Sequence, residues 1–180
     1  MPASYDWGVE HIGRLGDGGK WVCGMSQCED YAKDRECVMY SFGVRDESSF
    51  EQEMPSRTDC VVWVYDFSVK DFGSQVDSKH HDQAHFKQIG IAGTTDTTLF
   101  YSIADLMEMN GHDYIDILKM DIDEAKYDAL DSLHRDFPAS TGEELPIGQL
   151  MVEIHIYDNK NSMIVLDWWE RLEARGLCSA

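Results

Sequence analysis

The sequence is short of basic residues and has no long apolar run. Its 180 residues include 15 Lys and Arg against 34 Asp and Glu, which gives a formal net charge of −19. A surface this acidic repels phosphate backbones and anionic lipid, so we expect neither a nucleic acid nor a membrane partner. No segment reaches the roughly 18 apolar residues of a membrane helix, and the N-terminus lacks the apolar core of a signal peptide. The chain as given is therefore expected to be soluble, and its compartment stays open because a removed targeting or anchor segment would leave no trace.

The five cysteines are odd in number and form no CxxC pair. This spacing indicates neither a zinc site nor a closed disulfide framework. Buried or free thiols are favoured over a bridge from Cys23 to Cys28 or Cys37, which an oxidising compartment would allow. There is also no internal repeat, and the length is that of one domain.

Apolar segments alternate with amphipathic ones from residue 37 onward. The predicted strands cover residues 37–42, 60–67, 86–92, 115–122 and 149–157. The first predicted helix begins at a capping box, Ser48 to Glu51, and ends or kinks at Pro55. The other predicted helices cover residues 102–110, 125–137 and 163–175. Residues 1–36 are interpreted as a lead-in that packs on an α/β domain of residues 37–180. This alternation predicts a three-layer α/β sandwich with a mostly parallel sheet and right-handed crossovers.

Carboxylates follow the predicted strands at the points where a ligand is expected. The segment YIDILKMDIDEAKY (residues 114–127) runs from an apolar strand directly into Asp121 and Asp123, and the next strand carries Glu153 and His155. In open α/β sheets, ligands bind outside the carboxyl ends of the strands. We therefore expect the site at these strand ends.

The first two strands carry a second signal, which points to a nucleoside. Gly43 follows the first strand and precedes a helix, and Asp66 ends the second strand about twenty residues later. A glycine lets a ligand approach the backbone, and an Asp at the neighbouring strand end can accept both hydroxyls of a ribose. The segment SFGVRDESS (residues 41–49) lacks GxGxxG, and its Asp46 and Glu47 would repel a pyrophosphate. The pattern favours S-adenosylmethionine, whose sulfonium is cationic, over NAD or FAD.

Six segments resemble the eukaryotic methyltransferase-like family related to FkbM-type enzymes. They are GDGGKWVC (16–23), CVMYSFGVRDESSFE (37–51), VYDFS (64–68), QIGIAG (88–93), DILKMDIDEAKYDAL (116–130) and MVEIH (151–155). The resemblance implies the class I, Rossmann-like methyltransferase fold with S-adenosylmethionine as cofactor. It implies the following cofactor-binding residues: Ser41 and Gly43 at the methionine part, Asp66 at the ribose, Gly90 and Ile91 at the adenine, and Phe67 as a further residue of the cofactor site.

The chain departs from the FkbM pattern in several places. FkbM-type sequences have an acid where Ser41 stands and a second glycine near Glu47. The family's D-[IV]-E-G-x-E motif has Glu124 in place of its glycine and Lys126 in place of its last Glu. The sequence also ends after the last predicted helix, so the C-terminal β-hairpin of the class I fold is expected to be absent. An alternative function is therefore a catalytically inactive methyltransferase-fold domain that serves in binding or dimerisation.

Methyl transfer to a hydroxyl of a small molecule or carbohydrate requires a base near the strand ends. The candidate catalytic residues are Asp121, His155 and Glu153. A divalent cation held by Asp121 and Asp123 is a second possibility, because a metal lowers the pKa of an acceptor hydroxyl. In a purely structural alternative, Lys119 pairs with Asp121, while Glu153 and His155 bond helix ends. An open edge on the fifth strand, or the Trp168 and Trp169 surface, predicts a homodimer.

Overall fold

The computed structural model of the chain describes residues 8–16, 18–30, 35–74, 76, 80, 82–96, 98–123, 125–138, 144–154, 159–175 and 177. The predicted catalytic residue His155 and the motif residue Glu124 lie outside these residues. Within the part described, no helix is long and apolar enough to cross a bilayer.

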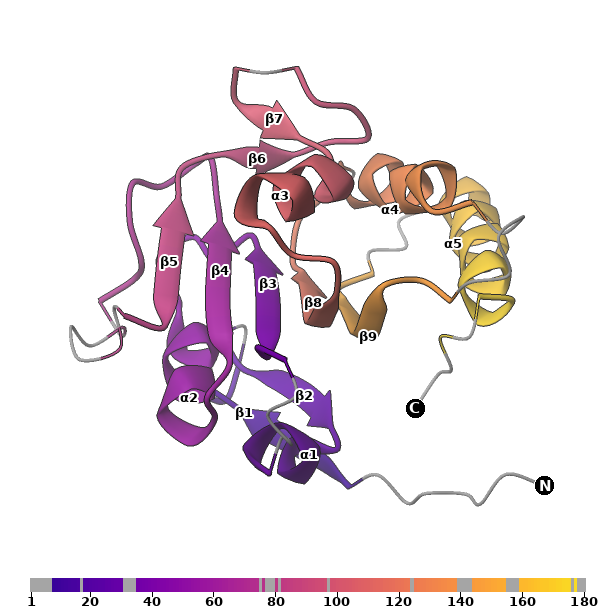
Figure 1. Cartoon of the computed structure of the whole chain (residues 1–180). Helices are drawn as coiled ribbons and strands as arrows, with labels where there is room; N and C mark the ends of the chain where they lie inside the picture. Colours follow the sequence, from indigo (N-terminus) through magenta and orange to yellow (C-terminus); the bar gives the residue numbers. More distant parts are fainter. Residues whose placement is uncertain are drawn as a thin grey trace.

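A parallel sheet forms the centre of the fold (Figure 1). Its strands are β3 (Val38–Phe42), β4 (Val61–Tyr65), β5 (Ala84–Lys87), β8 (Ile115–Met120) and β9 (Ile147–Val152). They lie in the order β5-β4-β3-β8-β9, and every neighbouring pair is parallel. Along the sequence, β4 and β5 are added on one side of β3, and β8 and β9 are then added on its other side, so the strand order reverses at β3. Such a reversal is the switch point at which open α/β sheets bind ligands.

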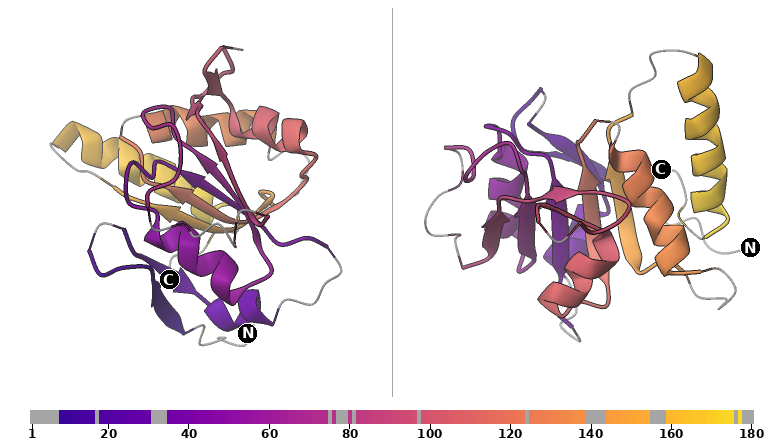
Figure 2. Two further views of the ribbon diagram at one scale, coloured as in Figure 1. Left: turned by 90° about the vertical axis from the view of Figure 1, so that its left-hand side faces the viewer. Right: turned by 90° about the horizontal axis from the view of Figure 1, so that it is seen from above.

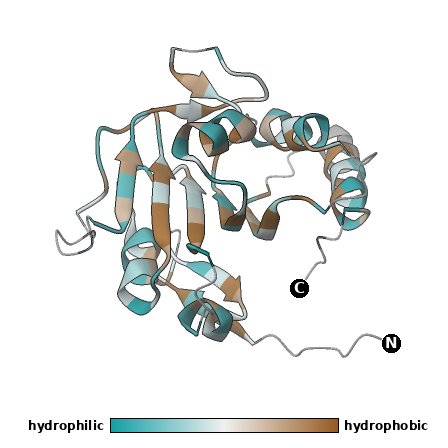
Figure 3. Cartoon of the chain, viewed as in Figure 1, coloured by the Kyte–Doolittle hydropathy of each residue, from teal (hydrophilic) through white to brown (hydrophobic). Residues whose placement is uncertain are grey.

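Helices cover both faces of this sheet and make three layers (Figure 2). They are α2 (Ser49–Arg57), α3 (Ile103–Asn110), α4 (Ala125–Asp136) and α5 (Asn159–Glu173). One core joins the sheet to α3, α4 and α5, and a second joins its other face to α2 and the N-terminal segment. The sheet strands carry much of the apolar colour in Figure 3, as expected for strands buried on both faces. The three-layer α/β prediction is confirmed.

The N-terminal segment is a hairpin followed by a short helix. Strands β1 (Val9–Ile12) and β2 (Lys20–Cys23) pair antiparallel, and α1 (Met25–Glu29) follows. Ile12, Val22 and Met25 are buried in the core beside α2. The lead-in therefore contributes to the core of the domain.

Several predicted elements differ in the structure. The strand predicted at 149–157 is β9, which ends at Val152, and the helix predicted at 163–175 is α5, which begins at Asn159. The strand predicted at 86–92 divides into β5 and β6 (Gly90–Ile91), and β6 pairs with β7 (Phe100–Tyr101) in a separate small sheet. Helix α2 continues through Pro55 to Arg57. Pro55 has no N–H to donate to the carbonyl four residues earlier, and the last turn is closed by Thr58, whose N–H and hydroxyl both bond the Met54 carbonyl.

The capping box predicted at α2 is wrong as well. Ser48 is the N-cap residue, but its side chain makes no capping bond; its Oγ accepts the N–H of Gly73 instead. Glu51 turns into the protein. The start of α3 agrees with prediction, since the Ser102 side chain accepts the N–H of Asp105 and Gly111 ends the helix with φ 75°.

The structure describes both features that were proposed for dimerisation, the edge of the fifth strand and the Trp168 and Trp169 surface. Within the described residues, β9 lies at an end of the sheet order. Trp168 is only 1% exposed, so it belongs to the core instead of the surface. A homodimer through the β9 edge stays a prediction.

A disulfide joins the two strands that precede the candidate site. Cys37 and Cys60 are bonded, with Cα atoms 4.5 Å apart, whereas Cys23 and Cys28 are free. The prediction of free thiols was wrong for this pair. The register that sets Val38 opposite Val61 brings the two preceding cysteines together, and five cysteines in a sequence do not reveal that pairing.

We predict that replacing Cys37 and Cys60 together by alanine lowers the free energy of unfolding by about 3 kcal/mol, because the bridge closes a loop of 23 residues in the unfolded chain. Urea unfolding measures the loss. The matched control is the double alanine variant of Cys23 and Cys28. Equal midpoints for both double variants, or free thiols at Cys37 and Cys60 in the native protein, would contradict the prediction.

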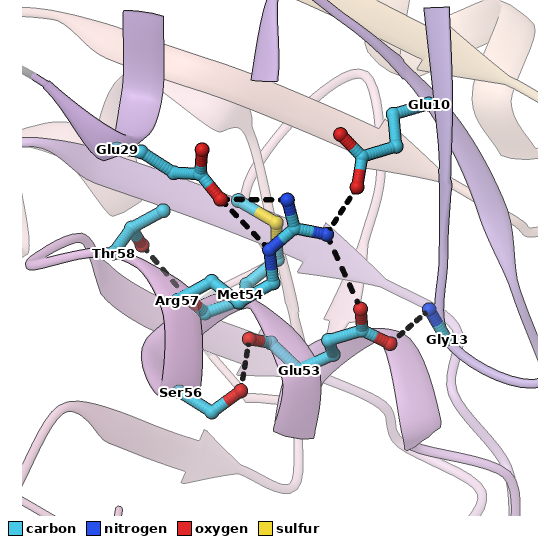
Figure 4. Close-up of polar contacts among 8 residues, drawn as sticks. All are labelled: Glu10, Gly13, Glu29, Glu53, Met54, Ser56, Arg57 and Thr58. Atoms are coloured by element: carbon cyan, nitrogen blue, oxygen red, sulfur yellow. Dashed lines mark hydrogen bonds and ion pairs between the residues drawn. The ribbon is translucent and has the colours of Figure 1, made fainter. Parts of the chain in front are cut away.

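Arg57 holds the N-terminal segment to α2 (Figure 4). Its guanidinium pairs with Glu10 of β1, with Glu29 of α1 at 2.6 Å and with Glu53 of its own helix at 3.4 Å. The second Glu53 oxygen accepts the N–H of Gly13 at 2.8 Å. The hydrogen bond from Arg57 holds the pKa of Glu10 below its usual range. One cation thus joins three elements that are far apart in the sequence.

We expect Arg57→Met to lower the melting temperature and to expose the hairpin to proteolysis, since three carboxylates would then repel one another without their common partner. The control is Arg171→Met, because Arg171 also pairs with two carboxylates, Asp131 and Asp167, which lie on α4 and α5. If both variants behave alike, Arg57 does not hold the hairpin.

Candidate active site

Four of the predicted site residues lie where neighbouring strands end. Gly43, Asp66, Asp121 and Glu153 follow β3, β4, β8 and β9 directly. Their backbone N–H groups donate to the neighbouring strands: Gly43 to Tyr65, Asp121 to Phe42 and Glu153 to Met120. The four strand ends therefore form one continuous edge across the switch point.

The turn after β3 is shaped by close backbone contact. Gly43 has φ +77°, and a Cβ at this position would lie 2.1 Å from the carbonyl oxygen of Asp121. Only glycine fits there. Two residues later, Arg45 has φ 48°, and it is the only non-glycine residue with positive φ in the described part of the chain. Such a backbone persists only where its surroundings hold it.

Asp66 holds this turn. One carboxylate oxygen accepts the N–H groups of Val44 at 2.9 Å and Arg45 at 2.8 Å, and the other accepts the N–H and hydroxyl of Ser68. Burial alone would raise the pKa of Asp66, but the bonds from Ser68, Arg45 and Val44 outweigh it and lower the pKa. These four bonds match the acceptor capacity of a carboxylate. A ribose contact would have to share or displace one of them, and it stays a prediction.

Below the strand ends lies a buried ion pair that the sequence did not reveal. The Lys119 ammonium donates to the Gly43 carbonyl at 2.7 Å and lies 3.2 Å from Glu51 of α2. Glu51 accepts the hydroxyl of Ser41 at 2.6 Å. Ser41, predicted to line the cofactor, is fully buried beneath the turn. The other Glu51 oxygen is buried and has no partner in the described part of the chain.

Asp121 lies between two lysines and a second carboxyl. Its Oδ2 is 2.7 Å from the ammonium of Lys20, on β2, and 4.0 Å from that of Lys119. Burial would raise the pKa of Asp121, but hydrogen bonds with Glu153 and Lys20 and the charge of Lys119 leave it lowered. The structure thus brings the predicted pair Asp121 and Glu153 together and adds Lys20, which no pattern in the sequence indicated.

The metal prediction gains no support from the described residues. Among them, no group of three or more His, Cys, Asp or Glu is arranged to hold a metal ion. The nearest cation to Asp121 is Lys20. Beyond Asp123, Lys126 is buried and donates to the Ile122 carbonyl at 2.7 Å, and burial lowers its pKa.

Phe67, Gly90 and Ile91 converge beside Asp66. The Phe67 side chain is 52% exposed, and its ring centroid lies 5.3 Å from that of Phe100. Gly90 lies so close to this pair that a Cβ would be 2.5 Å from the Phe100 ring. Ile91 is buried in the core. An exposed aromatic surface therefore stands next to the strand end that carries Asp66.

A cavity of about 790 Å³ opens between the hairpin turn and the loops after β3 and β4. This volume is typical of small-molecule sites. Arg14 pairs with Glu47 across it at 3.2 Å. Arg45 also lines it, and within the described chain its guanidinium has no hydrogen bond or ion pair. The lining residues are Arg14, Leu15, Gly18, Arg45, Asp46, Glu47, Val69, Asp71, Phe72, Gly73 and Ser74.

A family model described as a methyltransferase domain matches residues 6–178 of the chain. The chain belongs to this methyltransferase family. No curated protein and no solved structure gives a significant match. The matched range begins well before residue 37, so the methyltransferase domain as the family defines it includes the N-terminal hairpin. The finer relation to FkbM-type enzymes stays a prediction.

We predict that Lys119→Met destabilises the methyltransferase domain by about 3–5 kcal/mol, because the Glu51 carboxylate would remain buried without its ammonium partner. Urea unfolding measures this. The double variant Lys119→Met with Glu51→Gln should recover much of the loss, since no buried charge is then left unpaired. A loss below about 1 kcal/mol in the single variant, the range of an exposed pair, would show that Lys119 is not buried as described.

Proposed function

We propose that the protein is an S-adenosylmethionine-dependent methyltransferase that methylates a hydroxyl of a small molecule or carbohydrate. Family membership supports methyl transfer, and methyltransferase domains generally use this cofactor. The observation that carries the proposal is the cavity lined by the loops that follow β3 and β4, where the Arg45 guanidinium lies beside the carboxylates of Asp46 and Asp71.

The charges around the cavity suit the amino-acid end of S-adenosylmethionine. The Arg45 guanidinium is available to pair with a carboxylate, and Asp46 and Asp71 line the same cavity for an ammonium group. When bound, the cofactor supplies a methyl group on a sulfonium, and this cation is favoured by acidic surroundings. The aromatic surface of Phe67 beside Asp66 suits an adenine ring.

The same turn is unsuited to a dinucleotide. A pyrophosphate normally binds the free N–H groups at the start of the first helix. Here Asp66 already accepts the N–H groups of Val44 and Arg45, and Glu47 accepts that of Ser49 at 3.1 Å. A diphosphate would have to displace these carboxylates, so NAD and FAD are disfavoured.

The acceptor half of the reaction is assigned to the ends of β8 and β9. There Asp121 and Glu153 share a hydrogen bond. A lowered pKa keeps Asp121 ionised at neutral pH, so it can accept the hydrogen bond of an acceptor hydroxyl and orient its oxygen for in-line attack. A carboxylate with a lowered pKa is a weak base, so Asp121 is assigned the orienting role and Glu153 is a candidate base. His155 remains a candidate base.

The alternative is a methyltransferase fold that binds or dimerises without catalysis. The saturated carboxylate of Asp66 favours it, because the residue expected to hold the ribose is already occupied by its own turn. Cofactor binding with turnover of an acceptor would exclude this alternative.

We expect S-adenosylmethionine and its demethylated product to bind with affinities on the order of micromolar, and NAD not to bind. Arg45→Ala should weaken binding by about tenfold or more, because a charged hydrogen bond to the carboxylate is lost. Calorimetric titration of all three ligands measures this, with Arg171→Ala on the far helix α5 as control. Binding of NAD without S-adenosylmethionine would overturn the proposal, and unchanged affinity in Arg45→Ala would remove the role of that arginine.

A further inference from the structure

The N-terminal hairpin places a lysine at the acceptor side of the site. Lys20 is the first residue of β2, and its ammonium lies 2.7 Å from Oδ2 of Asp121 at the end of β8. Both side chains are mostly buried, with exposed fractions of 21% and 24%. This short ion pair is therefore shielded from water and stronger than a surface pair.

The position of Lys20 is fixed from both sides. On the same strand, the N–H and carbonyl of Cys23 make two hydrogen bonds, at 3.2 and 3.0 Å, with the side chain of Gln149 on β9. Arg57 holds β1 to α2 through Glu10. The hairpin is thus attached to the strand beside Asp121 as well as to α2, and this attachment fixes the backbone from which Lys20 reaches Asp121.

Lys20 differs from the two other lysines near these carboxylates. Lys119 donates to the Gly43 carbonyl and pairs with Glu51, and Lys126 donates to the Ile122 carbonyl. Those two ammonium groups hold the backbone and the core. Lys20 instead approaches Asp121 from another part of the chain, at the distance of a direct ligand.

We propose that Lys20 is a positioning residue of the acceptor site, a resident cation that neutralises and orients Asp121. This inference rests on the proposed function, because the proposed function assigns Asp121 to the methyl acceptor. It makes the hairpin part of the active site, and it makes the site independent of added metal, since the space beside the carboxylate is already filled by an ammonium group.

Mn²⁺ serves as the probe, because carboxylates freed of their lysine should bind it. Wild type and Lys20→Arg, which keeps the charge, are expected to show no Mn²⁺ binding by calorimetry and no shift in melting temperature. Lys20→Met should bind Mn²⁺ at least about tenfold more tightly, because a unit positive charge next to Asp121 is gone. Adding Asp121→Asn should abolish this gain. Lys70→Met, at an exposed site, is the control with the same change in net charge.

The outcomes are distinct from those for the proposed function. Wild type that binds Mn²⁺ as tightly as Lys20→Met would overturn the inference, and so would Lys20→Met that gains no affinity for Mn²⁺. Lys20→Gln provides the same test if the Met variant does not fold. S-adenosylmethionine is titrated into wild type and into each folded variant. If wild type does not bind it, the result counts against the proposed function. If Lys20→Met keeps its affinity for S-adenosylmethionine and gains affinity for Mn²⁺, the result supports a role of Lys20 that is confined to the acceptor side.

Discussion

The candidate site depends on one buried cation, the ammonium of Lys119. It lies at the point where the strand order reverses and joins β8 to the Gly43 carbonyl after β3 and to Glu51 of α2. A charge in this position is tolerated only because a carboxylate and a carbonyl compensate it. The arrangement fixes the turn at Gly43 against Asp121, where a side chain has no room. The positions of the neighbouring strand ends follow from this contact.

A second consequence concerns which ligands the turn can accept. Asp66 bonds two N–H groups of the turn after β3, so those donors are unavailable to a phosphate. The bonds also hold Arg45 with positive φ, and this places its guanidinium at the cavity. In this arrangement Asp66 stabilises the turn after β3, and the Arg45 side chain takes the place of the backbone N–H groups as the donor to an anion. The proposed preference for a single carboxylate over a diphosphate thus rests on the backbone of the turn.

The sequence predicted the sheet and its strand ends well, because apolar density and the residues that follow each strand are local signals. Asp121 and Glu153 were placed together on that basis, and the structure brings them into contact. Glu51 was misassigned because the same letters describe a capping box and an acid turned toward a buried lysine. Lys20 could not be found from the sequence, since its contact with Asp121 exists only after the hairpin has packed on the domain. The pairing of Cys37 with Cys60 follows from strand register in the same way.

The distribution of charge connects these observations. The chain carries a net charge of −19, yet Arg45, Lys20 and Lys119 gather around the strand ends. Acidic surroundings favour a cationic sulfonium over the neutral thioether that remains after methyl transfer. Under the function proposed above, the same field would favour S-adenosylmethionine over its product. The local cations limit the cost of gathering carboxylates at the ends of β8 and β9, because Lys20 and Lys119 both lie beside Asp121.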